Sequence, residues 1–172
     1  VSHESFVGYA LAEGVFPTYS DLDAHAMAQA GVDLAVRRVI AAGARPDRIA
    51  ALDNYCWPDP LPGALNPDAE HKAAQLVRAS RGLSEICIAY GVPLISGKDS
   101  MKNDSTRGGR KISIPPSVLV SAIGKIDDVR RAVTLEAKAP GDLVYVIGAT
   151  RAELGASELA YARAEAVGST TD

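Results

Sequence analysis

Hydrophobic and polar residues follow two different rhythms along this chain. Apolar residues gather in short runs at 6–15, 48–57 and 92–96, and these runs predict strands. At 22–42, and again from 66 to 91, apolar residues recur every three or four positions, which predicts two long helices. The first half of the chain therefore reads strand, helix, strand, helix, strand.

Residues that commonly begin and end helices stand at the ends of both periodic segments. Ser20 or Asp21 offers a side-chain cap for the first helix, and Gly43 stands where a left-handed cap would end it. The triplet at 66–68 (Asn-Pro-Asp) predicts the start of the second helix, because proline suits the first helical position and acid suits the positive helix end. Gly91 predicts its end.

Further strands are predicted beyond residue 106. Residues 107–110 contain two glycines and predict a turn, and residues 112–126 are rich in β-forming side chains. Within that stretch Pro115 and Pro116 must lie at an edge or bulge, because proline donates no hydrogen bond to a ladder. A very apolar run at 143–148 predicts one more strand.

The end of the chain adds little that could form a core. Asp127 and Asp128 predict a cap for one short turn of helix, and residues 153–167 predict a longer helix. Residues 168–172 predict a loose end. One strand and one helix after residue 127 are too little for an independent core.

Two long helices must bury their apolar faces against a sheet, which predicts a two-layer α+β domain. We expect both helices on one face of a mixed, mainly antiparallel sheet. This domain would occupy 1–126 and be incomplete at its start. Residues 127–172 would be a linker and the truncated beginning of a second α/β domain.

Composition narrows the class of protein. The chain has 172 residues, of which 47% are hydrophobic and 23% charged, and its net charge of −3 gives no basic field for nucleic acid. No apolar run approaches the roughly 20 residues of a membrane span, and the first residues hold no signal peptide. Cys56 and Cys87 form no C-x-x-C pair, which argues against a zinc site or disulfide framework and for a reduced, cytoplasmic protein.

The densest candidate chemistry follows the run at 92–96, in a loop predicted at 97–104. Its polar and flexible residues are Gly97, Lys98, Asp99, Ser100, Lys102 and Asp104. Glycine lets backbone N–H groups approach a ligand, lysine neutralises phosphate, carboxylates hold Mg²⁺ and serine donates a hydrogen bond. Since open sheets hold ligands at the carboxyl ends of strands, the loop predicts a phosphate site.

Two other interpretations of this loop compete with a phosphate site. A P-loop requires a glycine five residues before the Gly-Lys pair and a serine or threonine after it, whereas this chain has Val92 and Asp99 there. The alternative without function is a solvated turn, in which Lys98 and Asp99 form a weak exposed ion pair.

Several motifs, taken together and in order, resemble the phosphoribosylformylglycinamidine synthase family. The resemblance covers nearly the whole chain and rests on Tyr-Ser-Asp-Leu-Asp at 19–23, Asp-Asn-Tyr-Cys-Trp at 53–57, Ile-Ser-Gly-Lys-Asp-Ser-Met-Lys-Asn-Asp at 95–104, Lys-Ile-Ser-Ile-Pro-Pro at 111–116 and Ile-Gly-Lys-Ile-Asp-Asp-Val-Arg at 123–130.

The resemblance implies an architecture. Members carry two tandem units like aminoimidazole ribonucleotide synthetase, and this chain resembles the amino-terminal domain of the second unit. In the family such domains pair through their sheets into a barrel-like core, with active sites at the seam. The implied partners are the rest of the synthase chain, including its first repeat, and a glutaminase domain or subunit; pairing through the sheet also allows a homodimer.

The resemblance also implies a reaction: ATP, Mg²⁺ and glutamine-derived ammonia convert formylglycinamide ribonucleotide to the amidine. The family's catalytic histidine belongs to the first unit, so this chain is expected to hold no catalytic residue and to be inactive alone. Two alternatives are a non-catalytic repeat that only closes the barrel, and another synthetase of the superfamily, such as the cyclo-ligase.

Four site residues follow from the resemblance. Asp53, Gly97 and Lys98 match positions that contact ATP or its metal, and Ser100 matches a serine that contacts the substrate. Lys98 replaces a Mg²⁺-contacting asparagine, so no metal ligand is expected here. Residues 34–38 (Leu-Ala-Val-Arg-Arg) depart from a Glu-Ala-x-x-Asn pattern that holds Mg²⁺ at an auxiliary nucleotide site, so no such site is expected.

Overall fold

The computed structural model describes residues 3–162 of the chain. It divides at residue 133 into two compact units, each described by itself. The first unit contains a four-stranded sheet and two long helices, with these elements in chain order: β1 (Gly8–Gly14), η1 (Pro17–Asp21), α1 (Ala24–Ala41), β2 (Ile49–Cys56), α2 (Ala69–Tyr90), β3 (Leu94–Ser100), β4 (Asp104–Arg107), β5 (Arg110–Ser113), β6 (Ser117–Ile126) and η2 (Val129–Arg131).

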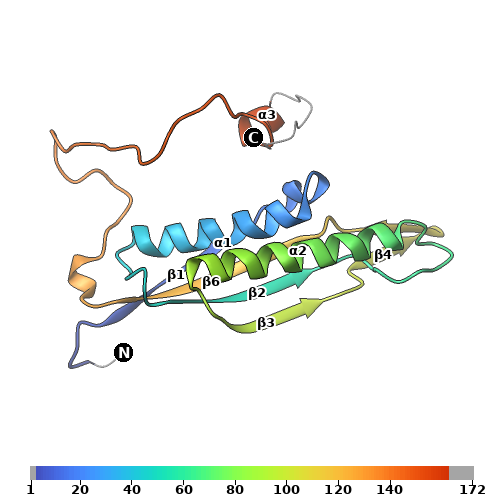
Figure 1. The fold of residues 1–172 in the computed structure, drawn as a ribbon, viewed down its shortest axis with the longest axis horizontal. Helices are drawn as coiled ribbons and strands as arrows, with labels where there is room; N and C mark the ends of the chain where they lie inside the picture. The colour runs from blue at the N-terminus through green and yellow to red at the C-terminus, as the bar shows by residue number, and fades with distance from the viewer. Residues whose placement is uncertain (1–2, 163–172) are drawn as a thin grey trace. The chain divides into compact units, whose positions relative to one another are not determined.

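The sheet is mixed and mainly antiparallel, with the strand order β1-β6-β2-β3. β6 pairs antiparallel with both β1 and β2, and β2 pairs parallel with β3. Both helices lie along the same face of this sheet (Figure 1). The predicted two-layer α+β fold is therefore confirmed.

The core lies between the helices and the sheet. Alternate residues of β6 face it, because side chains in a strand alternate between the two faces. Helix α2 approaches α1 closely: a Cβ added at Gly82 would lie 2.4 Å from the carbonyl oxygen of His25. The largest fully buried side chains include Trp57, Met27, Val32, Val39, Val118 and Val120.

Helix α1 begins later than the sequence predicts. Its N-cap is Asp23, whose carboxylate accepts hydrogen bonds from the backbone N–H groups of His25 (2.8 Å) and Ala26 (3.4 Å). The predicted cap at Ser20 or Asp21 is wrong, since these residues end η1, where the Ser20 hydroxyl donates to Pro17 O at 2.8 Å.

Helix α2 also begins later, at Ala69. Asn66 is not its cap: its side-chain amide donates to the carbonyl oxygens of Asp59 (2.8 Å) and Leu61 (2.7 Å) and so closes the preceding loop. The predicted end is confirmed, because Gly91 adopts a left-handed conformation with φ 64°.

The largest change from the sequence prediction concerns β3. It extends from Leu94 to Ser100, so Gly97 and Lys98 belong to a strand and the expected loop there is wrong. Parallel pairing with β2 continues along these residues, as far as Ser100, and keeps them in extended conformation. Their polarity is tolerated because β3 is an edge strand and nearly all of its residues are exposed.

The predictions for 107–132 hold well. Gly108 and Gly109, with φ 56° and 74°, form the turn between β4 and β5. The two prolines at 115–116 lie between β5 and β6, where no ladder hydrogen bond is required. Asp128 caps η2 by accepting a hydrogen bond from the Arg130 N–H at 3.0 Å.

In the second unit the predicted strand at 143–148 is wrong. No described residue of that segment is in a strand, and the side chains of Val144 (93%) and Ile147 (98%) are exposed. A strand requires a hydrogen-bonded neighbour, and the only helix or strand described in this unit is α3 (Glu158–Ala162). Of the helix expected at 153–167, residues 163–167 lie outside the described part of the chain, as does the loose end at 168–172.

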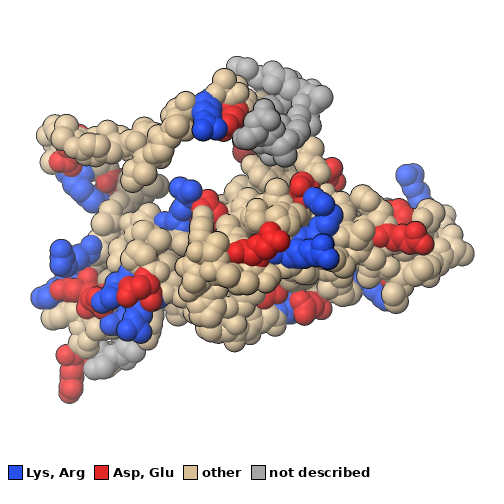
Figure 2. Space-filling model, viewed as in Figure 1, with Lys and Arg blue, Asp and Glu red and all other residues tan. Residues whose placement is uncertain are grey.

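Charged side chains of both signs are intermixed on the face of the molecule drawn in Figure 2. Many are paired, as where Arg45 contacts Asp47 (2.7 Å) and Asp127 (3.3 Å). Such exposed pairs contribute little to stability. Among the described helices, none has both the length and the apolar character that crossing a membrane would require.

Candidate functional site

Asp53 on β2 and Gly97 on β3 lie directly opposite each other in the parallel ladder. The Asp53 carboxylate occupies the space beside the Gly97 Cα that a side chain would otherwise fill. A Cβ built on Gly97 would lie 2.9 Å from Asp53 Oδ1. Real Cβ atoms essentially never approach an oxygen so closely, so a side chain at position 97 would displace the carboxylate.

Lys98 and Ser100 lie on the other face of the sheet. Successive side chains of a strand point to opposite faces, so Lys98 and Ser100 share one face and Gly97 has the other. The Lys98 ammonium donates to Ser100 Oγ at 2.7 Å, which agrees with this placement. The structure thus divides the four predicted residues into two pairs, with Asp53 and Gly97 facing the helices and Lys98 and Ser100 facing away.

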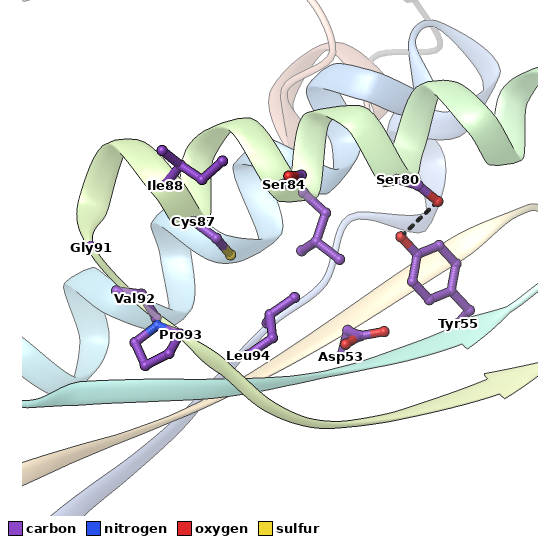
Figure 3. A pocket seen from close by; sticks show the side chains of 11 residues that line it. Asp53, Tyr55, Ser80, Ser84, Cys87, Ile88, Gly91, Val92, Pro93 and Leu94 are labelled. Carbon is purple, nitrogen blue, oxygen red and sulfur yellow. Dashed lines mark hydrogen bonds between the residues drawn. The ribbon is translucent and has the colours of Figure 1, made fainter.

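Asp53 lies in a groove of about 720 Å³ between α2 and the strands β2 and β3. Figure 3 shows the helix above and the strands below, with the Asp53 carboxylate between them. The walls are mostly apolar, and Ser80, Ser84 and Tyr55 add hydroxyl groups. The apolar side chains of the groove include Leu83, Cys87, Ile88, Pro93 and Leu94.

The Asp53 carboxylate is the one acidic side chain in the lining of this groove. Burial, and to a lesser extent the charge of Asp99, raises the pKa of Asp53 above its ordinary value. Among the described residues, no other residue gives this carboxylate a hydrogen bond or an ion pair. Its own backbone N–H is the one donor that acts on it, and the groove walls around it are mostly apolar.

The two other titratable groups that line the groove, Tyr55 and Cys87, stay neutral near pH 7. Burial raises the pKa of the Tyr55 hydroxyl, which donates to Ser80 Oγ at 3.3 Å (Figure 3). Burial, and then the charge of Asp53, raises the pKa of the Cys87 thiol. Within its lining the groove therefore offers one negative charge, Asp53, among neutral groups, and the charge of Asp99 acts on it from the neighbouring strand.

A second polar cluster, which no sequence pattern predicts, lies around the loop after β2. Lys111 contacts Asp59 Oδ2 at 3.2 Å and Asp104 Oδ2 at 3.6 Å, and the side chains of Lys111 and Asp104 are only 14% and 8% exposed. Asp104, expected to hold Mg²⁺, instead pairs with a lysine and accepts from the Asp59 N–H at 2.8 Å. Nothing in the spacing of these residues marks the cluster, because long-range contacts bring them together.

Lys72 extends this network from α2. Its ammonium, on a side chain only 7% exposed, contacts Asp68 Oδ1 (2.8 Å), Asn66 Oδ1 (2.7 Å) and Ser113 Oγ (3.0 Å). These three oxygens accept the three hydrogen bonds that the ammonium can donate. Lys72 therefore stabilises the fold and is not free to bind an anion. Within the described residues, no group of three or more His, Cys, Asp or Glu side chains could hold a metal ion.

At the position expected to lack the auxiliary nucleotide site, Arg38 on α1 donates to the carbonyl oxygen of Glu13 at 2.6 Å. Arg37 pairs with Asp33 at 2.6 Å one turn away. Both guanidinium groups are thus engaged by the protein itself. The absence of a Mg²⁺–nucleotide site there stays a prediction.

Comparison with known proteins adds to this geometry. The chain is 33% identical over 150 residues to the phosphoribosylformylglycinamidine synthase subunit PurL of Rhodopseudomonas palustris (strain BisB18), and 34% identical over 151 residues to that of Thermomicrobium roseum. These alignments cover 87% and 88% of this chain but 19% of each relative. The chain therefore spans about one fifth of the length of the curated relatives that it matches.

Solved structures agree on the fold. PurLQS from Thermotoga maritima matches with a TM-score of 0.57 and 26% identity, over 75% of this chain and 19% of that chain. PurL of the same organism complexed with ATP, and complexed with FGAR, matches with TM-scores of 0.59 and 0.58 at 24% identity. Those two cover 79% of this chain and 21% and 20% of theirs.

The sequence profile of "AIR synthase related protein, N-terminal domain" matches residues 5–126. That range begins just before β1 and ends with the last residue of β6, so it contains all four strands of the sheet and both long helices. The chain belongs to the family of AIR synthase related proteins and contains its N-terminal domain.

Proposed function

We propose that this chain is part of an ATP-dependent ligase of purine biosynthesis that converts formylglycinamide ribonucleotide to the amidine, with glutamine as the nitrogen donor. The observation that carries the proposal is the pairing of Asp53 with Gly97 beside Lys98 and Ser100, on two adjacent strands of a family domain. The names of the relatives, and the ATP and FGAR complexes of the Thermotoga maritima protein, support it.

ATP supplies the chemistry of the step by turning the substrate amide oxygen into a phosphate leaving group. In this chain, the Lys98 ammonium and the Ser100 hydroxyl supply a positive charge and a donor for phosphate or substrate oxygens. Gly97 leaves its backbone open to close approach. Mg²⁺ would be held by other parts of the synthase, since Lys98 repels a cation and the described residues offer no metal cluster.

The chain fits the amino-terminal-type domain of the second synthetase repeat at 1–126, followed by the start of the next domain at 127–172. The end of the family match at residue 126 supports that boundary. Its partners would be the first repeat, which carries the catalytic histidine, and a glutaminase domain or subunit. Alone the chain would be inactive. The complete enzyme would be located in the cytoplasm.

The sheet face opposite the helices is the surface that would meet the other repeat or a second copy. Leu11 (76% exposed), Tyr9 (54%) and Leu52 (38%) lie on this open face. An open apolar sheet face is typical of an interface. The same observation supports the second candidate, a non-catalytic repeat that only closes the barrel. The relatives favour the synthase over the cyclo-ligase.

Substitution in the complete synthase separates catalysis from scaffolding. We expect Asp53→Ala and Ser100→Ala each to lower kcat/KM by about 10- to 100-fold, the range for loss of a hydrogen bond that involves a charged group. Asn103→Ala serves as the control, since it removes only the side-chain amide that donates to Ser100 O and keeps the backbone N–H that donates to Trp57 O. Unchanged turnover per folded molecule in both variants would leave the scaffold as the function.

A further inference from the structure

We propose that Lys111 is a positioning residue: it fixes the chain at the end of β3, and so the place of Ser100, without touching substrate itself. It acts through the carboxylates of Asp59 and Asp104, which belong to two different segments of the chain. This role rests on the proposed function, in which Ser100 contacts the ribonucleotide, and deepens it by naming what holds that serine in place.

The end of β3 is joined to the loop after β2 by backbone hydrogen bonds. The Trp57 N–H donates to Ser100 O at 2.8 Å, and the Asn103 N–H donates to Trp57 O at 3.0 Å. Lys102, in the turn between β3 and β4, has a positive φ of 59°, which a residue other than glycine keeps only when the surrounding structure imposes it. The shape of this turn therefore depends on contacts outside it.

Three charged side chains beside the turn provide those contacts. Asp104 accepts a hydrogen bond from the Asp59 N–H at 2.8 Å, which joins the start of β4 to the loop after β2. The Lys111 ammonium, from β5, lies 3.2 Å from Asp59 Oδ2 and 3.6 Å from Asp104 Oδ2. Lys102 is a weaker partner, since its ammonium is 4.0 Å from Asp59 Oδ1 and its side chain is 59% exposed. One largely buried ammonium thus ties the two segments together.

The two carboxylates would repel each other without Lys111, because both are ionised near pH 7. Burial favours the neutral form of Asp104, yet hydrogen bonds from Ser113 and from the Asp59 N–H hold its pKa below the ordinary value. A hydrogen bond from the Leu61 N–H likewise lowers the pKa of Asp59. Loss of the ammonium would leave two adjacent anions that push the loop and β4 apart, and the end of β3 would move with them.

A double-mutant cycle in the complete synthase tests whether Lys111 acts through Ser100. We expect Lys111→Met to lower kcat/KM for formylglycinamide ribonucleotide by about 10- to 100-fold, as for a contact displaced by about 1 Å, and to leave the KM for ATP within about 2-fold. In a Ser100→Ala background the same change should cost less than about 3-fold, because the positioned contact is already gone. Lys125→Met is the control, since its partner Asp127 is 51% exposed, and should leave both constants unchanged.

A rescue variant separates positioning from a loss of fold. Asp104→Asn in the Lys111→Met background removes one of the two facing anions and keeps an oxygen for the Asp59 N–H, so it should recover at least about 3-fold in kcat/KM. Amide hydrogen exchange at 100–104 should be faster in Lys111→Met and slow again in the rescued variant. If Lys111→Met does not fold, Asp59→Asn takes its place in the cycle, because it keeps the acceptor for the Leu61 N–H and loses the one for Lys111.

The outcomes distinguish this role from the proposed function. If the losses from Lys111→Met and Ser100→Ala simply multiply, or if Lys111→Met leaves kcat/KM per folded molecule unchanged, the positioning role is overturned and the proposed function stands. If Ser100→Ala itself leaves kcat/KM unchanged, the serine has no contact to be positioned and the role is overturned as well. If Asp53→Ala is also without effect, the proposed catalytic function is overturned with it.

Discussion

At the scale of single residues, Asp53 and Gly97 form a matched pair. The carboxylate can lie where it does only because position 97 has no Cβ. The residues are 44 positions apart in the chain but face each other in the ladder. The glycine therefore has a steric role that the turn expected from the sequence would not have required.

The variant Gly97→Ala should displace the Asp53 carboxylate, because the new Cβ would lie 2.9 Å from Oδ1. We expect an affinity for ATP about 10-fold lower, measured by calorimetry on the complete synthase, since one hydrogen bond to a charged group is lost. Gly63→Ala is the control, because nothing lies within 4 Å of its added Cβ. Equal ATP affinity in both variants would show that the carboxylate position is irrelevant to binding.

The raised pKa of Asp53 has a consequence for stability. Burial, and next the charge of Asp99, disfavours the ionised form, so the native state pays a penalty above the native pKa that vanishes as pH falls below the unfolded value near 4. Asp53→Asn should therefore stabilise the protein at pH 7, by less than about 1 kcal/mol because the side chain is only partly buried. Urea unfolding at pH 7 and at about pH 3, below the unfolded pKa, measures this, and a gain that persisted in full at about pH 3 would contradict it.

At the scale of elements, the network around Lys72 joins the start of α2 to the loop before it and to β5. One buried ammonium links Asp68, Asn66 and Ser113. Asn66, which resembles a helix cap in the sequence, is required instead by this network and by the loop carbonyls. This use of its side chain explains why α2 begins at Ala69.

Lys72→Met should lower the free energy of unfolding by about 2 kcal/mol, because it leaves the buried Asn66 Oδ1 without its donor. Lys125→Met is the matched control. Its partner, Asp127, is 51% exposed, so the loss should stay below about 1 kcal/mol. Denaturant unfolding of both variants measures the difference, and equal losses would mean that the network contributes no more than a surface pair.

At the scale of the whole molecule, the first unit has one covered sheet face and one uncovered face. The helices bury the first, and the second presents exposed leucine and tyrosine side chains. Both β1 and β3 are also edges of the sheet among the described strands. A domain of this form is expected to function against a neighbour.

Leu11→Glu should destabilise the complete synthase if another domain covers the open face, by about 3 kcal/mol for a charge buried without a partner. Leu61→Glu, at a 54% exposed loop position away from the sheet, should change stability by less than about 0.5 kcal/mol. Thermal and denaturant unfolding measure both. Equal effects would mean that the open face is solvated in the assembled enzyme.

The amino-acid sequence by itself determined the order strand, helix, strand, helix, strand from β1 to β3, the glycine caps at Gly43 and Gly91, and the family, because these depend on local spacing and short motifs. It could also indicate the four site residues, whose roles remain predictions. Only the tertiary structure decided that 97–100 is a strand, and hence that Lys98 and Ser100 face away from Asp53. The physical reason is that strand pairing and burial depend on partners distant in the chain, which local patterns do not specify; the same absence of a partner leaves 143–148 without a strand.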